Sequence, residues 1–464
     1  MTLCKSLRRT SPGGRIYPPS MRASRERRAS PPSKSKRHPL PQAISLVILA
    51  LLPLAATAQL DVVITRSTQR AIPIAIVPFE WRITLGLPYD FARIVEADLE
   101  RTGQFAPMGR ETMITRPTRF AEMRLDNWRI MDVEAVLVGH VSGSEANPVV
   151  EFELVDVYAG RSLLVYRLQS SREAMRATAH RIADLVYEQL TGARGMFSTR
   201  LAYVQVTPGR EEFRLTVADA DGQNPIVVLR STEPIMSPSW SRDGVYLAYV
   251  SFEAGYAEVF VQEVATGQRR PLSPERTSAS APAWSPDGRS LAVARNLNAN
   301  SDIFIYSIDG GAPRRLTRHS ATETEPEFSA EGDRVYFTSD RGIGPQVYVV
   351  PAQGGRAQRV SFTGSYNARP RLQPDRNQIA IVHQQDGRFR IGLMDLRDES
   401  LRLLTDGPLD ESPSFAPNGR ALIFGAGTAA GRGLGVYFID SGVMRLLRTP
   451  DGILREPAWG PYEN

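Results

Sequence analysis

The residue types that carry out most protein chemistry are few in this sequence, and their spacing does not suggest catalysis. The chain has 464 residues, with five histidines and a single cysteine, Cys4. None of the four histidines after residue 58 has a second histidine, a cysteine or a carboxylate at a metal-ligand spacing. There is no G-x-S-x-G nucleophile elbow and no G-x-x-x-x-G-K phosphate-binding loop. We therefore expect no catalytic residues, no metal site, no cofactor and no enzymatic activity.

The remaining candidates for chemistry have simple structural interpretations. The segment Asp219-Ala220-Asp221-Gly222 resembles the start of a calcium-binding loop but lacks the downstream glutamate that completes one. Because Asp-Gly favours the positive φ angles of tight turns, we interpret this segment as a hairpin turn. His140, at the end of a predicted strand, and His180, in the middle of a predicted helix, are interpreted as packed or surface residues.

A phrase of about eight residues returns regularly in the second half of the chain, and it indicates the elements that must position any site. Its anchor residues are Trp240, Trp284, Phe328, Leu372, Phe415 and Trp459, spaced 44, 44, 44, 43 and 44 residues apart. Short segments of alternating apolar and polar residues follow each phrase, separated by turns rich in Gly, Asp and Asn. Four short strands in about 44 residues are typical of a β-propeller blade.

The two ends of the repeat region decide the number of blades. Residues 201–204, 213–219 and 226–230 match the second, third and fourth strands of a blade, but no phrase precedes them. The last phrase, at 456–462, is cut off by the C-terminus. We therefore predict that the C-terminal strand pairs with the 201–230 ribbon and closes a six-bladed propeller over residues 196–464.

Residues 59–195 differ in kind and predict a small α/β domain, so that the whole protein is mainly β. A buried strand is expected over 72–79, a second over 134–141 and a hairpin over 148–170. The expected helices cover 88–103, 121–132 and 170–191. Ser170 and Glu173 have capping-box spacing at the start of the third helix, and Gly192 is its expected stop.

Residues 1–58 predict a secretory signal that is removed. Residues 1–43 contain 11 basic side chains and one acidic one, and residues 44–58 contain no charge. The apolar run 43–58 has 16 residues, fewer than the ~20 that span a bilayer, and Ala56-Thr57-Ala58 is a typical cleavage sequence. The rest of the chain has a net charge of −4, which argues against a nucleic-acid partner. The expected location is the periplasm.

Polar and acidic residues recur just before the predicted innermost strands, which run beside the channel of a propeller. They are Glu233, Thr324, Glu325, Asp410, Glu411 and Glu456. Loops that ring one mouth of a rigid scaffold form a natural docking surface. Acidic residues before proline also occur simply because they solvate turns, and this alternative stays open.

Together these features resemble the TolB family, the periplasmic component of the Tol–Pal system. The likeness extends from about Gln59 to Tyr462. It is carried by the strings IPIAIVPFEW (72–81), EAVLVGHV (134–141), LDESPSFAPNG (409–419) and EPAWGPY (456–462). The resemblance implies a monomeric adaptor without catalysis that links the outer-membrane lipoprotein Pal to the TolA C-terminal domain. Such an adaptor maintains outer-membrane integrity and supports envelope constriction at cell division, and other outer-membrane proteins are further candidate partners.

The resemblance also implies two sets of binding residues. Pal is expected at loop residues of the propeller mouth, Ala281, Thr324 and Glu325, whereas Ser278 stands where the family often has a histidine. The expected TolA-binding arm comprises Gln59, Leu60, Asp61, Val62, Val63, Ile64, Thr65, Arg66 and Ser67. From its residues alone, this β-prone segment could also be a terminal strand of the α/β domain, or be docked in one state and free in another.

Two functions of other classes remain as alternatives. A propeller lyase or hydrolase would need a cluster of histidines and carboxylates in the channel, and the spacing predicts none. A glycan-binding sensor would be favoured by aromatic residues around the channel mouth, whereas the predicted loop residues are small or acidic.

Overall fold

The computed structural model describes residues 59–63, 70–83, 90–207, 209, 212–273, 275–298, 300–374, 377–428, 431–449 and 452–463. The predicted signal, residues 1–58, and the second half of the predicted arm, Ile64–Ser67, lie outside these ranges. Residues 56–464 form one compact unit. Among the described residues, no helix has both the length and the apolar character needed to cross a bilayer.

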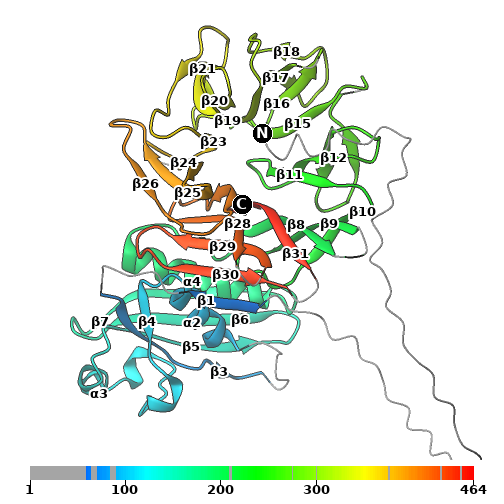
Figure 1. The fold of residues 1–464 in the computed structure, drawn as a ribbon. Helices are drawn as coiled ribbons and strands as arrows, with labels where there is room; N and C mark the ends of the chain where they lie inside the picture. The colour runs from blue at the N-terminus through cyan, green and yellow to red at the C-terminus, as the bar shows by residue number, and fades with distance from the viewer. Residues whose placement is uncertain are drawn as a thin grey trace, which may run out of the picture. The chain divides into compact units, whose positions relative to one another are not determined.

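Six sheets arranged in a ring make up the second half of the chain (Figure 1). Blade 1 contains β31 (Ile453–Trp459), β8 (Arg200–Thr207), β9 (Glu212–Asp219) and β10 (Ile226–Ser231). Blade 2 contains β11 (Ile235–Trp240), β12 (Tyr246–Ser251), β13 (Glu258–Glu263) and β14 (Arg269–Pro271). Blade 3 contains β15 (Ala279–Trp284), β16 (Ser290–Leu297), β17 (Asn300–Ser307) and β18 (Arg314–Arg315).

The other three blades repeat the same antiparallel order. Blade 4 contains β19 (Glu323–Phe328), β20 (Arg334–Ser339), β21 (Gln346–Pro351) and β22 (Gln358–Arg359). Blade 5 contains β23 (Asn367–Leu372), β24 (Gln378–Gln385), β25 (Arg388–Asp395) and β26 (Leu401–Leu403). Blade 6 contains β27 (Glu411–Phe415), β28 (Ala421–Thr428), β29 (Gly431–Phe438) and β30 (Met444–Arg448), and its outer edge carries a fifth strand, β1 (Gln59–Val63).

The C-terminal strand closes the ring, as the sequence predicts. Strand β31 lies antiparallel to β8, with Trp459 opposite Leu201 and Ala458 opposite Ala202. The composite blade therefore joins the last strand of the chain to the first ribbon of the propeller. Because β8 is paired on both sides, the first ribbon has no free inner edge.

The anchor tryptophans of the repeat connect neighbouring blades. The Trp284 indole N–H donates to the Ser239 carbonyl of blade 2 at 3.1 Å, and that of Trp240 donates to the Ala458 carbonyl of blade 1 at 3.2 Å. Both side chains are also packed in apolar clusters that span two blades. A large aromatic ring with one polar atom suits this position, because it fills the space between sheets and bonds a backbone carbonyl.

The described part of the α/β domain is a mixed sheet with three α-helices and two short 3-10 helices. The strand order is β4 (Phe105–Pro107), β2 (Ile72–Ile76), β5 (Ala135–Gly143), β6 (Pro148–Asp156) and β7 (Arg161–Gln169), and β3 (Glu80–Trp81) also pairs with β5. Helix α2 (Phe91–Arg101) begins at Asp90, whose carboxylate accepts from the Arg93 amide. Of the face expected to be apolar, Phe91, Val95 and Leu99 are buried and Ile94 is partly buried. The remaining helices are η1 (Arg110–Thr112), η2 (Phe120–Glu122), α3 (Leu125–Ile130) and α4 (Met175–Thr191).

Two helix predictions need correction. Helix α4 begins at Met175, so the predicted capping box at Ser170 and Glu173 is wrong. The Ser170 amide donates to the Pro148 carbonyl of the β6–β7 hairpin at 2.9 Å, and its hydroxyl bonds the Thr178 hydroxyl at 2.7 Å, so both groups that a capping box uses are already engaged. The helix expected over 121–132 is instead split into η2 and α3. The predicted stop at Gly192 is confirmed, with φ = +73°.

The α/β domain and the propeller share one hydrophobic core. Val95 of α2 and Val186 of α4 belong to the same cluster of buried residues as Phe438 and Leu447 of blade 6. The Ser441 hydroxyl donates to the Thr102 carbonyl at the end of α2, at 2.6 Å. In the segment between the domains, the Asp184 carboxylate accepts from the Phe197 amide at 2.7 Å. These contacts fix helices α2 and α4 against the propeller.

Candidate binding site at the propeller axis

Every innermost strand contains a β-bulge at the residue that precedes its proline. These residues are Ser237, Ala281, Glu325, Arg369, Ser412 and Glu456, with φ angles between +51° and +55°. In each case the register with the neighbouring strand shifts at this point. Proline fits a bulge because it has no N–H to give to the ladder. A left-handed non-glycine residue costs on the order of 1–3 kcal/mol, and such positions gather at binding sites. The ring of six is therefore the candidate site.

Charged side chains of this ring meet across three blades. Arg369 of blade 5 donates from Nε to Glu325 Oε1 of blade 4 at 2.6 Å. Its Nη1 bonds the Ser412 hydroxyl of blade 6 and lies 3.3 Å from Glu456 Oε2 of blade 1. Blades 5 and 1 are separated by blade 6, so side chains from both can meet only near the axis. The backbone amide of Arg369 and the Thr338 hydroxyl complete the site by donating to Glu325 Oε2, each at 3.0 Å.

This network is mostly buried, and its opposite charges stabilise each other's ionised forms. The Arg369 and Glu456 side chains are 16% and 7% exposed. Burial alone would lower the pKa of Arg369, but Glu456 and Glu325 together raise it above its usual value. Burial alone would raise the pKa of Glu456, but the Arg369 guanidinium outweighs it and holds that pKa below 4.5. Arg369 and Glu456 are therefore both ionised at neutral pH.

The structure brings two of the predicted Pal-binding residues to equivalent places. Ala281 and Glu325 are the bulge residues of the neighbouring blades 3 and 4, and Thr324 directly precedes Glu325 in β19. The expectation that these residues lie in loops is wrong, because β15 and β19 already include them. The bulge explains the difference: a strand can continue through the residue before proline only if the ladder is interrupted there.

Other acidic residues that the sequence singled out have separate places. Glu233 is exposed in the connection before β11. Asp410 is buried beside Gly427, and burial raises its pKa. Glu411 lies 3.3 Å from Arg432 of its own blade. Glu456 belongs to the ring, as described above.

Sequence reasoning missed Arg369 and Ser412 as members of the site. A signal was present, because both residues precede the proline of a repeat phrase. Aligned on that proline, the six phrases give Ser, Ala, Glu, Arg, Ser and Glu. The charged residues of this column occur in blades 4, 5 and 1, and they are the ones that form the ion pairs.

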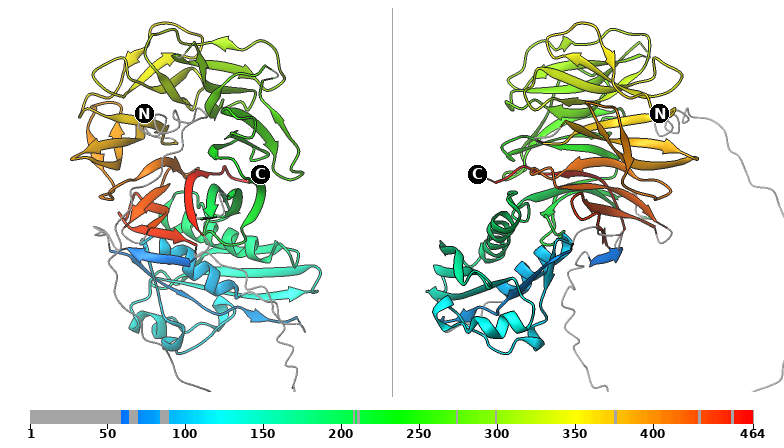
Figure 2. Two further views of the ribbon diagram at one scale, coloured as in Figure 1. Left: turned by 45° about the vertical axis from the view of Figure 1, so that its right-hand side comes forward. Right: turned by 90° about the vertical axis from the view of Figure 1, so that its left-hand side faces the viewer.

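The backbone of the predicted arm is docked on the propeller (Figure 2). Strand β1 pairs antiparallel with β30, with Gln59 opposite Arg448 and Val63 opposite Met444. The alternative that this segment is a strand of the α/β domain does not describe this structure, because β1 belongs to the sheet of blade 6. Docking satisfies the outer edge of β30, which would otherwise be an unpaired strand edge.

One further group of side chains has donor atoms as close together as those of a metal site, but the Arg176 guanidinium already occupies its two carboxylates. Within the described part of the chain, His180, Asp219 and Asp221 are the only three potential metal ligands whose donor atoms lie within 4.8 Å of one another. The first is on α4 and the other two are at the end of β9, so sequence spacing could not reveal them. The interpretation of Asp219–Gly222 as a turn is confirmed, since the Gly222 amide donates to the Asp219 carbonyl at 2.8 Å.

Comparison with known proteins assigns both domains. The family described as TolB amino-terminal domain matches residues 60–163, and the family described as TolB beta propeller domain matches residues 187–463. The chain belongs to the TolB family. Membership of this family agrees with the mainly β fold, the small α/β domain and the six-bladed propeller predicted from the sequence.

Curated relatives and a solved structure cover most of the TolB-family chain. The Tol-Pal system protein TolB of Thioalkalivibrio sulfidiphilus is 51% identical over 431 residues, which are 91% of this chain and 99% of the relative. The protein of the same name from Xanthomonas oryzae pv. oryzae is 48% identical, over 92% of this chain and 99% of the relative. The crystal structure of TolB from Acinetobacter baumannii has a TM-score of 0.80 and 32% identity, and the match covers 88% of this chain and all of that one.

Proposed function

We propose that this TolB-family protein is a periplasmic adaptor of the Tol–Pal system that binds two proteins and catalyses no reaction. It binds Pal at the channel mouth near Ala281, Thr324 and Glu325, and it binds the TolA C-terminal domain through the arm of residues 59–67. By linking them it maintains outer-membrane integrity and supports envelope constriction at cell division. The observation that carries the proposal is the docking of β1, the described part of the arm, on the outermost strand of blade 6, β30.

The bulge ring supports a binding role for the channel. Its residues are held in place by the closed ring, so a partner meets preformed positions and loses little entropy in ordering them. The two carboxylates of the ring are already bonded to Arg369. In the described part of the channel they are therefore not placed as a free acid and base pair, which argues against a lyase or hydrolase.

The edge pairing of the arm supports a TolA-binding role that depends on release. A segment that can add itself to the edge of one sheet can add itself to the edge of another, because both use the same backbone donors and acceptors. Docked on β30, the backbone groups along one edge of β1 are occupied, and this is the edge that we propose binds TolA. Binding of TolA by strand addition then requires the arm to leave β30, so the docked and bound states exclude each other.

Substitutions at the channel mouth test the Pal site. We expect Ala281→Arg in the mature chain, residues 59–464, to weaken binding of the soluble domain of Pal at least tenfold, because the new side chain occupies the contact surface and adds an unpaired charge. Glu325→Arg should have the same effect, although it also breaks the bond to Arg369. Isothermal titration calorimetry measures both affinities.

A matched control for this experiment is Glu233→Arg, which adds a positive charge at an exposed residue outside the ring. It should leave the affinity within about twofold. Circular dichroism and thermal unfolding establish that each variant is folded. If folded Ala281→Arg binds Pal as tightly as the unaltered chain does, Pal binds elsewhere.

Removal of the arm tests the TolA site. We expect deletion of residues 59–67 to abolish binding to the TolA C-terminal domain, while the propeller stays folded and binds Pal with unchanged affinity. The reason is that β1 lies at the outer edge of blade 6, so the ring itself does not need it. Titrations against both partners make the measurement. Retained TolA affinity after the deletion would place that site outside the arm.

A further inference from the structure

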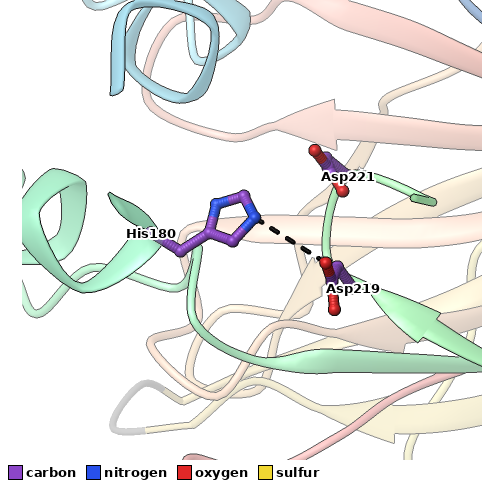
Figure 3. A group of neighbouring side chains, drawn as sticks. All are labelled: His180, Asp219 and Asp221. Atoms are coloured by element: carbon purple, nitrogen blue, oxygen red, sulfur yellow. Dashed lines mark ion pairs between the residues drawn. The ribbon is translucent and has the colours of Figure 1, made fainter. Parts of the chain in front are cut away.

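A cluster of charged side chains around His180 connects the α/β domain to the propeller. The function proposed above gives His180 no role. His180 of α4 is 2% exposed, and its Nδ1 lies 2.6 Å from Asp98 Oδ2 of α2. Its other ring nitrogen, Nε2, has no hydrogen-bond partner among the described residues. That atom points toward the propeller, 3.9 Å from Asp219 Oδ2 (Figure 3). A buried ring nitrogen aimed at carboxylates is a position for a proton or a metal ion.

The position of the Arg176 guanidinium favours a proton over a metal ion at Nε2. Its Nε donates to Asp219 Oδ2 at 3.0 Å, and its Nη2 bonds Asp221. A cation therefore already bridges the two carboxylates that a metal ion would need. A divalent ion placed beside this guanidinium and beside Arg101 would meet strong repulsion. A proton on Nε2 adds only one charge and needs no rearrangement of ligands.

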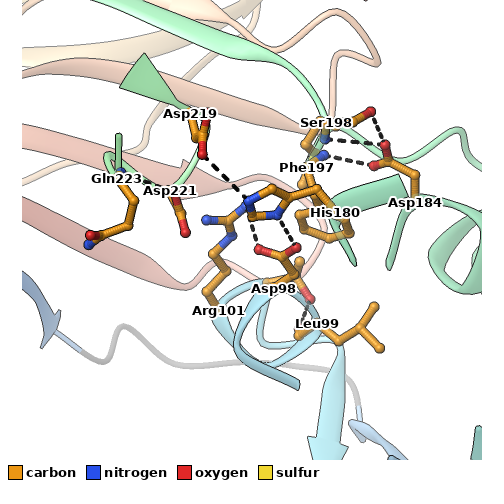
Figure 4. A network of polar contacts seen from close by, with 12 residues as sticks. Asp98, Leu99, Arg101, His180, Asp184, Phe197, Ser198, Asp219, Asp221 and Gln223 are labelled. Carbon is orange, nitrogen blue, oxygen red and sulfur yellow. Dashed lines mark hydrogen bonds and ion pairs between the residues drawn. The ribbon is translucent and has the colours of Figure 1, made fainter. Parts of the chain in front are cut away.

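The charges around the ring favour that proton. The cluster contains three carboxylates, Asp98, Asp219 and Asp221, and Arg101 bonds Asp98 (Figure 4). A second guanidinium, that of Arg176, bonds Asp219 and Asp221. A protonated His180 supplies the third positive charge and balances the cluster. Burial alone would lower the pKa of His180, but Asp98 and Asp221 outweigh both burial and Arg101 and raise it above 6.5.

Two other charged groups near the cluster, Arg445 and Asp184, do not take the place of a proton on His180. Arg445 of β30 lines the same small interdomain cavity as Arg101 and Ala220, but within the described part of the chain it forms no ion pair with Asp98, Asp219 or Asp221. Asp184, on the same helix as His180, is engaged by the Phe197 amide and by the Ser198 amide and hydroxyl. The carboxylates that face Nε2 are thus those of the propeller turn.

We propose that His180 binds a proton that holds the carboxylates of the α/β domain and of the propeller together, so that the docking of the two domains weakens as the pH rises. Asp98 belongs to the α/β domain, whereas Asp219 and Asp221 belong to blade 1. Loss of the proton leaves an excess of negative charge in a site that water barely reaches. The proposal does not depend on which partners the protein binds.

The sign of the effect follows from proton linkage. A histidine whose pKa is higher in the folded state than in the unfolded state stabilises the fold fully below the unfolded value. That stabilisation is lost as the pH rises through the folded value. With one linked proton, the folding equilibrium constant falls by up to tenfold per pH unit between 6.5 and the raised value.

Two measurements on the mature chain test the proposal. Nuclear magnetic resonance with ¹⁵N-labelled histidine should give His180 a titration midpoint above 6.5, and Asp221→Asn should shift that midpoint down. Denaturant unfolding across pH 6–9 should show the loss of stability in the unaltered chain but not in His180→Gln. His140→Gln is the matched control, since His140 is also buried but bonds Glu151 within the α/β domain. It should keep the pH dependence of the unaltered chain.

The outcomes separate the proposal from a purely structural role. A midpoint at or below 6.5, or the same pH dependence in His180→Gln as in the unaltered chain, would overturn it. A midpoint that Asp221→Asn does not move would also overturn it, because the proton would then belong to the Asp98 pair alone. The Asp221→Asn variant keeps His180 and Asp98, so the test stands even if His180→Gln fails to fold.

Discussion

At the scale of single residues, the most informative position in each blade is the one before the repeated proline. The backbone there is left-handed in all six blades. The charged side chains at this position form ion pairs with one another near the axis. Arg369 is the centre of this chemistry, because it bonds Glu325, Ser412 and Glu456 from three other blades. The ring thus combines a strained backbone with mostly buried charges of opposite sign.

Removing Arg369 should be costly. We expect Arg369→Met to lower the free energy of unfolding by about 3–5 kcal/mol, because two buried carboxylates lose their counter-ion. Urea unfolding at pH 7 measures the change. The difference from the unaltered chain should shrink at acid pH: the pKa of Glu456 is held below 4.5, so its stabilising charge is lost as the pH falls through that lowered value.

A loss under 1 kcal/mol at pH 7 would contradict this account. Adding Glu456→Gln to Arg369→Met should recover part of the stability.

At the scale of elements, the first and last strands of the described chain, β1 and β31, occupy opposite kinds of sheet edge. Strand β31 completes blade 1 from inside, next to the axis, whereas β1 extends blade 6 from outside. Deleting an inner strand breaks the ring, but deleting an outer one only exposes an edge. This difference is why β31 is suited to closing the fold and β1 to reversible docking.

The closing strand can be tested through its anchor. Trp459 is 7% exposed, and its indole N–H donates to the Thr199 hydroxyl at 2.8 Å. We expect Trp459→Ala to lower the free energy of unfolding by about 3–5 kcal/mol, through a lost aromatic side chain and the cavity it leaves. Trp459→Phe, the matched control, keeps most of the bulk and should cost about 1 kcal/mol for the hydrogen bond. Equal losses in the two variants, measured by denaturant unfolding, would mean that packing of this strand does not hold the ring closed.

At the scale of the whole molecule, the α/β domain and the propeller behave as one compact unit from residue 56 onward. Helix α2 is the common element: its C-terminal end contacts Ser441 beside β30, and its Asp98 contacts His180. The strand that docks the arm and the charge cluster between the domains are therefore both connected to α2.

Much of this organisation was predictable from local patterns in the sequence. The 44-residue spacing of the tryptophan anchors, the incomplete first blade and the truncated last phrase are sufficient to predict six blades closed by the C-terminal strand. Helix α2 was predictable because Phe91, Val95 and Leu99 recur with helical period, and Asp90 is a favourable cap. The prediction of a capping box at Ser170 was wrong because the amide of this residue donates to a carbonyl within the β6–β7 hairpin.

Local sequence determined the strands, the blades and their closure, because alternation, turns and repeat spacing are properties of neighbouring residues. Tertiary structure alone decided that Arg369 meets Glu325 and Glu456, that β1 lies on β30, and that His180 faces Asp219 across two domains. These pairs are tens to hundreds of residues apart, and ring closure and domain docking bring them together. The physical reason is that ion pairs and hydrogen bonds form between groups that lie a few ångströms apart in space, whatever their separation along the chain.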